Sequence, residues 1–265
     1  MKIIFQSIII LCTALTLFIT GCKKNEDKRP VPTVSDTEPA NFLNPYDSFG
    51  YWHNVILDSI EQHRTVGRSV NFDRSCGLIR RFYRMKDWPE LKESHFAQIP
   101  QVVTDAATDI YGFIDRSPWS DSVKARLLQL TNIILQPEAD TLTYPQLKEV
   151  VGCFENGVLQ SSLAVKDKEV LLKSSAIARY SAYRWKQRPE LHGIYDHNML
   201  LKFNQENGFA TAPIAALKSK QDGFFTRVGK WIAVTAIDIS GAITDLSVAS
   251  GAAASDFMKE VFKAH

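Results

Sequence analysis

The sequence predicts an all-α protein: an irregular helical bundle of about six to eight helices, preceded by a signal peptide and a flexible tether. Two observations predict this fold class. Apolar residues recur at helical spacing over most of the chain after residue 48, so each segment carries one apolar face. The strict alternation of apolar and polar residues that is typical of strands is absent. Short connections favour antiparallel neighbours in one domain, residues 45–265.

The first two helices are expected over about residues 48–64 and 74–86. Their apolar positions are three or four residues apart, as one face of a helix requires. In the first helix these positions are Phe49, Trp52, Ile56, Ile60 and His63, and in the second Leu78, Ile79, Phe82 and Tyr83.

Capping residues and prolines mark the next helices. Pro100 suits the first turn of one helix, and Ser117 followed by Pro118 predicts an N-cap and a first helical residue for the next. Thr143 is the expected N-cap of a third, and a longer helix over about 166–187 ends before Pro189. Their apolar faces are Val103, Ala106, Ile110, Phe113 and Ile114; Val123, Leu127, Leu130 and Ile134; Leu147, Val150, Val151, Phe154 and Val158; and Leu171, Ala178, Ala182 and Trp185.

The C-terminal part is less regular. Residues 188–227 are expected to form loops around one or two short helices. Residues 228–248 are rich in small side chains and predict a closely packed core helix. Insertion of this segment into a membrane is the alternative, but Asp238 and Asp245 share one face, and each would cost about 2.5–3.5 kcal/mol at the centre of a bilayer.

The first 22 residues carry a targeting signal. Lys2 is followed by an apolar run over residues 3–18, then by Gly21-Cys22 and a polar stretch. This pattern resembles a bacterial lipoprotein signal peptide, which implies removal of residues 1–21 and lipidation of Cys22. Two acyl chains give durable anchoring. An uncleaved membrane anchor is the alternative, since about 19 apolar residues roughly span a hydrocarbon core.

Residues 22–44 are the expected tether. They contain Pro30, Pro32 and Pro39 and few large apolar groups, so they bury too little surface to offset the entropy of ordering. A flexible coil of about 22 residues spans roughly 25 Å. The expected location is therefore the bacterial cell envelope, with the chain lipid-anchored to the outer membrane on its periplasmic or its outer side.

Charge and cysteine content bound the partners. The net charge of +2 creates no strong field, so nucleic acid is not an expected partner.

The cysteines of the folded body are Cys76 and Cys153, because Cys12 is expected to be removed with the signal peptide. In an oxidising compartment these two either form a disulfide or stay as separate buried thiols.

The candidate ligand cluster is formed by His53, Asn54 and Asp58. Asn54 and Asp58 are four residues apart and share a helix face, and His53 borders it. Such a cluster can bind a ligand or hold a proton in a cleft. The alternative is that the three side chains serve capping and packing.

The same region carries a family resemblance. The block Asn-Pro-Tyr-Asp at 44–47, with Gly50 and His53-Asn54, resembles uncharacterised lipoproteins of Bacteroidota. A second block, Ala-Arg-Tyr-Ser at 178–181, and the small-residue tail with its aspartate are similar to two further blocks of such proteins. The resemblance implies a location but no activity and no catalytic residue.

Other chemistry-bearing patterns are weaker. His192, Asp196 and His197 are residue types that ligate zinc, but the His-Glu-x-x-His arrangement is absent. Ser181 lacks the flanking glycines of a hydrolase nucleophile. Asp105 and Asp109 are expected on a solvated helix face or in ion pairs with Arg126 or Arg179. The basic-aromatic run 80–86 is expected to pack its aromatic rings and expose its arginines.

No cofactor, metal or catalytic residue is therefore expected. The leading hypothesis is a lipid-anchored, non-enzymatic interaction or accessory module with a possible protein partner in the envelope. A tethered hydrolase or metal-dependent enzyme is the alternative, and a membrane-active effector that uses the C-terminal small-residue segment is the second alternative.

Overall fold

The computed structural model describes residues 38–62, 72–91, 93–136, 138–187, 235, 238–241 and 249–254. By its internal contacts the chain divides into Met1–Val34 and Ser35–His265, and every described residue lies in the second unit. The described part contains helices and no strand, which confirms the predicted all-α bundle. The helices are α2 (Asp47–Gln62), α3 (Phe72–Met85), α4 (Glu93–Ala97), α5 (Ile99–Arg116), α6 (Asp121–Leu135), α7 (Glu138–Thr141), α8 (Tyr144–Gln160) and α9 (Val165–Lys186).

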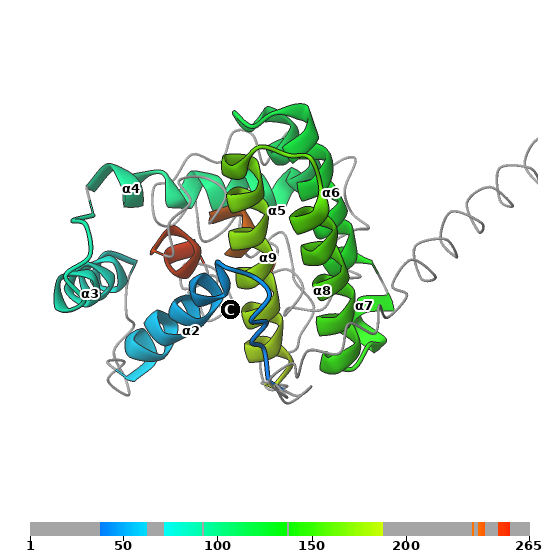
Figure 1. The fold of residues 1–265 in the computed structure, drawn as a ribbon. Helices are drawn as coiled ribbons and strands as arrows, with labels where there is room; N and C mark the ends of the chain where they lie inside the picture. The colour runs from blue at the N-terminus through cyan, green and yellow to red at the C-terminus, as the bar shows by residue number, and fades with distance from the viewer. Residues whose placement is uncertain are drawn as a thin grey trace, which may run out of the picture. The chain divides into compact units, whose positions relative to one another are not determined.

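Helix α9 is the centre of this arrangement. It packs most extensively against α2 on one side and α8 on the other, and also contacts α6 (Figure 1). Every residue from 174 to 182 is buried, so this part of α9 is covered on all sides. A helix covered all round needs no polar face, and its serines and alanines let neighbouring helices approach closely.

The closest approach between α2 and α9 requires a glycine. A Cβ atom added at Gly50 would overlap the ring of Tyr180 and the backbone carbonyl of Ala176. Gly50 is itself buried. The α2–α9 crossing therefore depends on the absence of a side chain at this position.

Most predicted helices are present with small changes at their ends. The expected helices at 48–64 and 74–86 correspond to α2 and α3. Pro100 lies in the first turn of α5, and Thr143 is the N-cap of α8, where its N–H donates to Gln146 Oε1 at 2.8 Å. The short helices α4 and α7 were not predicted, because four or five residues are too few to show a helical period.

Two local predictions are wrong. The N-cap of α6 is Ser120 and not Ser117, because Ser117 ends α5, where its N–H donates to the carbonyl of Ile114 at 3.1 Å. Ser120 Oγ instead accepts the N–H of Val123. Val150 was expected on the buried face of α8 but is exposed. The buried positions of that helix, Val151 among them, lie on the side that faces α9 and α6.

Asp109 interrupts α5 with a non-helical backbone conformation. Its carboxylate accepts the N–H of Gly112 at 2.9 Å and lies 3.9 Å from Arg116 Nη1. Asp105 accepts a hydrogen bond from Gln101 at 2.7 Å. The two carboxylates therefore have separate local partners on the outside of the helix.

The C-terminal part is described only in pieces. Residues 188–227 lie outside the described residues, as does most of the expected helix at 228–248. The described pieces, 238–241 and 249–254, are helical and buried. No helix in the described ranges is long and apolar enough to cross a membrane. Cys76 is a buried thiol, so it forms no disulfide with Cys153.

Candidate functional site

A buried ion pair joins α8 to α9. Both Glu155 and Arg179 have fully inaccessible side chains. Arg179 Nε lies 3.2 Å from each carboxylate oxygen of Glu155, and Nη2 lies 3.1 Å from Oε1. Ser175 donates its hydroxyl to the same oxygen at 2.9 Å. The pair is therefore closely hydrogen-bonded, as a buried charge requires.

The segment that precedes α2 closes over this pair. Asn41 Nδ2 donates to Glu155 Oε2 at 2.6 Å, and Asn44 Nδ2 donates to Glu155 Oε1 at 2.7 Å. Arg179 in turn donates to the carbonyl of Pro39. These contacts place Pro39, Asn41 and Asn44, which were expected in the tether, within the packed body.

Asp47 completes the network from the first turn of α2. Its Oδ1 accepts a hydrogen bond from Arg179 Nη2 at 2.6 Å, and its Oδ2 accepts the hydroxyl of Tyr180 at 3.0 Å. One guanidinium thus serves two carboxylates. Glu155 is sealed in the interior, whereas the side chain of Asp47 keeps 16% of its surface exposed.

The network shifts the proton affinities of its members. Burial alone lowers the pKa of Arg179, but the carboxylates of Glu155 and Asp47 outweigh this effect and raise it. Burial raises the pKa of Tyr180 well above its ordinary value, and the charge of Asp47 raises it further. Burial also raises the pKa of Tyr144, whose hydroxyl donates to the Arg179 carbonyl. Arg179 is therefore held charged and both phenols are held neutral.

Asn54 and Asp58 bind residues of α9, whereas His53 contacts Asn54 and Asp238. Asn54 Nδ2 donates to the carbonyl of Tyr180 at 2.9 Å. Asp58 pairs with Arg184, although its side chain remains 49% exposed. His53 is fully buried, and its Nδ1 lies 3.1 Å from Asn54 Oδ1. The three residues share one helix, as predicted, but they meet neighbouring protein groups.

A second buried cluster brings together a serine, a histidine and an aspartate. Ser181 donates its hydroxyl to Asp238 Oδ2 and lies 3.1 Å from Thr235 Oγ1. His53 Nε2 lies 3.5 Å from the same oxygen of Asp238. In a hydrolase triad the serine bonds the histidine, which bonds the carboxylate. Here Ser181 bonds the carboxylate directly, and all of these side chains are inaccessible.

The three sequence blocks that carry the family resemblance therefore meet in the interior. Residues 44–47 contact Arg179 and Tyr180 of the second block, and Ser181 of that block contacts Asp238 in the tail. Sequence reasoning did not single out Glu155, the residue at the centre of the first network. Glu155 directly follows Phe154 on the buried side of α8. A lone charged residue among apolar positions is the sequence signal that could have identified it.

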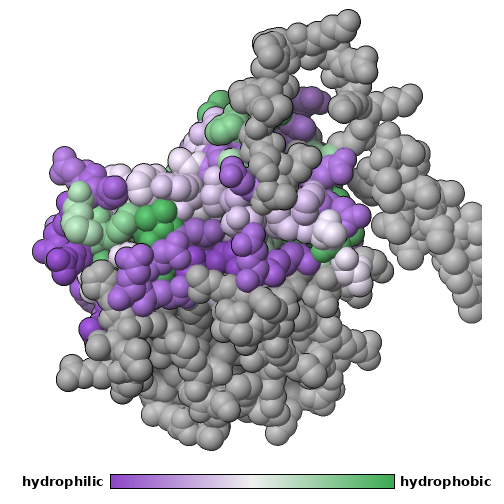
Figure 2. Space-filling model, turned by 90° about the horizontal axis from the view of Figure 1, so that it is seen from below, coloured by the Kyte–Doolittle hydropathy of each residue, from purple (hydrophilic) through white to green (hydrophobic). Residues whose placement is uncertain are grey.

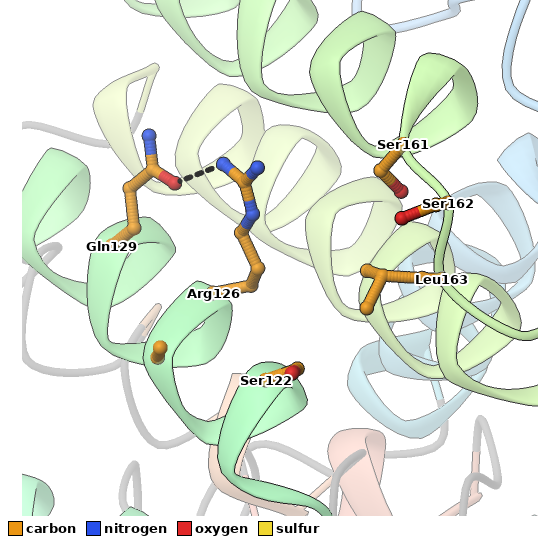
Figure 3. Close-up of a pocket in the computed structure, with 7 residues that line it drawn as sticks. Ser122, Arg126, Gln129, Ser161, Ser162 and Leu163 are labelled. Carbon is orange, nitrogen blue, oxygen red and sulfur yellow. Dashed lines mark hydrogen bonds between the residues drawn. The ribbon is translucent and has the colours of Figure 1, made fainter.

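A shallow pocket of about 420 Å³ lies between α6 and the connection from α8 to α9 (Figure 3). Arg126 and Gln129 project from α6, with Arg126 Nη1 donating to Gln129 Oε1 at 2.8 Å. Its lining comprises Ser122, Ala125, Arg126, Gln129, Ser161, Ser162 and Leu163. This set can hydrogen-bond a small polar group, and the predicted cluster at residues 53–58 takes no part in it.

Within the described ranges, no group of three or more His, Cys, Asp or Glu side chains is placed to hold a metal ion. Cys22 and the trio His192, Asp196 and His197 lie outside the described residues. No protein-family model, curated protein or solved structure matches the chain.

Proposed function

We propose that this protein is a lipoprotein of the bacterial cell envelope, held at the outer membrane by acyl chains on Cys22, and that its helical body is a non-enzymatic interaction or accessory module. The single observation that carries the proposal is the order of segments in the first 30 residues: a basic start, an apolar run, Gly21-Cys22 and a charged stretch. Lipidation explains why a cysteine stands directly after the apolar run of a signal peptide.

The interior of the body supports the non-enzymatic part of the proposal. The polar side chains that could carry chemistry form hydrogen bonds and ion pairs within the protein. Arg179 neutralises Glu155 and Asp47, and Ser181 and His53 surround Asp238. A buried network of this kind fixes the relative positions of helices. Glu155, His53, Ser181 and Asp238 are fully buried, and Asp47, whose side chain is 16% exposed, is bound by Arg179 and Tyr180.

Metabolic labelling with radioactive palmitate tests the anchor. The wild-type chain is expected to take up the label, and Cys22→Ala is expected to lose it. Cys12→Ala is the matched control, because it removes a thiol from the same N-terminal segment and is expected to label normally. Label that fails to enter the wild-type chain, or that enters Cys22→Ala equally, overturns the proposal.

Metal analysis of the purified full chain tests the non-enzymatic reading. Substoichiometric zinc is expected after extensive dialysis. One equivalent of tightly held zinc, lost on substitution of His192 or His197, would replace this reading with a metal-dependent enzyme.

A further inference from the structure

Helix α3 presents a basic face to solvent. Its inner side is buried and comprises Ser75, Cys76, Ile79, Phe82 and Tyr83. The exposed positions Arg74, Arg81 and Arg84 lie seven and three residues apart, which places them on one face of the helix. Figure 2 shows strongly hydrophilic residues at its left edge, the side on which α3 lies in Figure 1.

Positive charge is concentrated in this helix. Residues 72–86 contain five Lys or Arg residues and one Asp, for a net charge of +4. The whole chain carries +2, so the remainder carries −2. An almost neutral protein therefore has a local concentration of positive charge in this helix, which is the property that attracts an anionic surface.

Acidic neighbours cancel only part of this charge. Arg80 forms an ion pair with Glu93, and Asp73 and Asp87 lie at the two ends of the helix. Arg81 and Arg84, in the middle of the exposed face, form no ion pair with any residue in the described ranges. The centre of the face is thus available to an external anion.

Aromatic packing holds α3 with this face outward. Trp88, which follows the helix, makes edge-to-face contacts with Trp52, Phe82 and Tyr83 at ring-centroid distances of 5.3, 5.9 and 4.9 Å. Lys86 lies over the ring of Trp52 at 4.7 Å. Exposed Met85 adds an apolar side chain at the C-terminal end of the basic face.

We propose that the exposed face of α3 around Arg81 and Arg84 docks onto the anionic phospholipid headgroups of the membrane that holds the Cys22 anchor, and so sets the orientation of the body. This inference rests on the proposed lipid anchor. Each basic residue near an anionic surface strengthens binding about fivefold, and two together about 25-fold. The proposed tether, shortened to about 17 residues by the contacts of Pro39, spans roughly 20–25 Å, so the body stays near the membrane and weak attraction is enough.

The test uses the lipidated full chain reconstituted into vesicles, with a fluorescent non-natural amino acid in place of Met85. Lipids that carry a quencher at the headgroup report contact. Strong quenching is expected in vesicles containing phosphatidylglycerol, and weak quenching in phosphatidylcholine alone or in high salt. Arg81→Glu/Arg84→Glu is expected to reduce quenching to the phosphatidylcholine level.

Two controls separate the possible failures. Lys124→Glu/Lys166→Glu makes the same change of charge on α6 and α9 and is expected to leave quenching intact. Flotation of the protein with the vesicles reports the Cys22 anchor independently. If flotation is lost in every variant, the proposed anchor is refuted. The docking proposal is wrong if flotation is intact but quenching does not depend on lipid charge, on salt or on the α3 substitutions. If the double glutamate variant misfolds, Arg81→Gln/Arg84→Gln gives the same comparison.

Discussion

Arg179 Nε is equidistant from the two carboxylate oxygens of Glu155, at 3.2 Å from each, in a place where neither side chain reaches solvent. The same guanidinium binds Asp47 of α2. A single side chain in α9 therefore connects the two helices that flank it, α8 and α2.

Removing the arginine is expected to destabilise the fold strongly. Arg179→Met leaves two carboxylates without their cation, and breaking a buried pair in this way costs about 3–5 kcal/mol. Chemical denaturation measures the loss. Arg80→Met breaks the exposed pair with Glu93 and is the control, with an expected cost of about 1 kcal/mol or less. Equal costs for the two variants would contradict a structural role for the buried pair.

Any side chain at Gly50 is expected to destabilise the α2–α9 crossing. Gly50→Ala forces the helices apart, because the new Cβ overlaps Tyr180 and the Ala176 carbonyl, and overpacking typically costs about 1–3 kcal/mol. Gly77→Ala is the matched control: nothing lies within 4 Å of its added Cβ, and the helix gains about 0.5–1 kcal/mol from the change. Thermal unfolding of the two variants is expected to shift in opposite directions. A Gly50→Ala protein as stable as wild type would disprove the close crossing.

Stability is expected to fall in alkali. The folded state raises the pKa of Tyr144 and Tyr180 above 10.0, so the unfolded state releases these protons first as pH rises. The stabilisation that the two neutral phenols contribute is complete below about pH 10 and is lost as the pH rises above it. Melting temperatures from about pH 9 to about pH 11 are expected to decline less steeply in Tyr144→Phe than in wild type.

The serine in the second cluster is expected to be structural. Ser181→Ala removes a hydroxyl that donates to buried Asp238, and an unsatisfied buried acceptor costs about 1–3 kcal/mol. Ser122→Ala, at an exposed position of the Arg126 pocket, is expected to change stability by no more than about 0.5 kcal/mol. Denaturant titrations compare the two. If Ser181→Ala unfolds like wild type, the hydrogen bond to Asp238 does not support the fold.

The helical fold class and most helix positions could be predicted from the amino-acid sequence, because a helix shows in the local spacing of its apolar residues and in caps such as Thr143. The sequence also grouped Asn54 and Asp58, which share a helix face by local geometry alone, with His53 at the border of that face. The partners of these side chains depend instead on how the helices pack. The partners of Asn44, Asp47 and Ser181 lie 111, 132 and 57 residues away along the chain, and helical period carries no information about such pairings. Long-range packing gave the ligand candidates His53, Asn54 and Asp58 partners in distant parts of the chain, since a buried polar group must find a partner inside the fold.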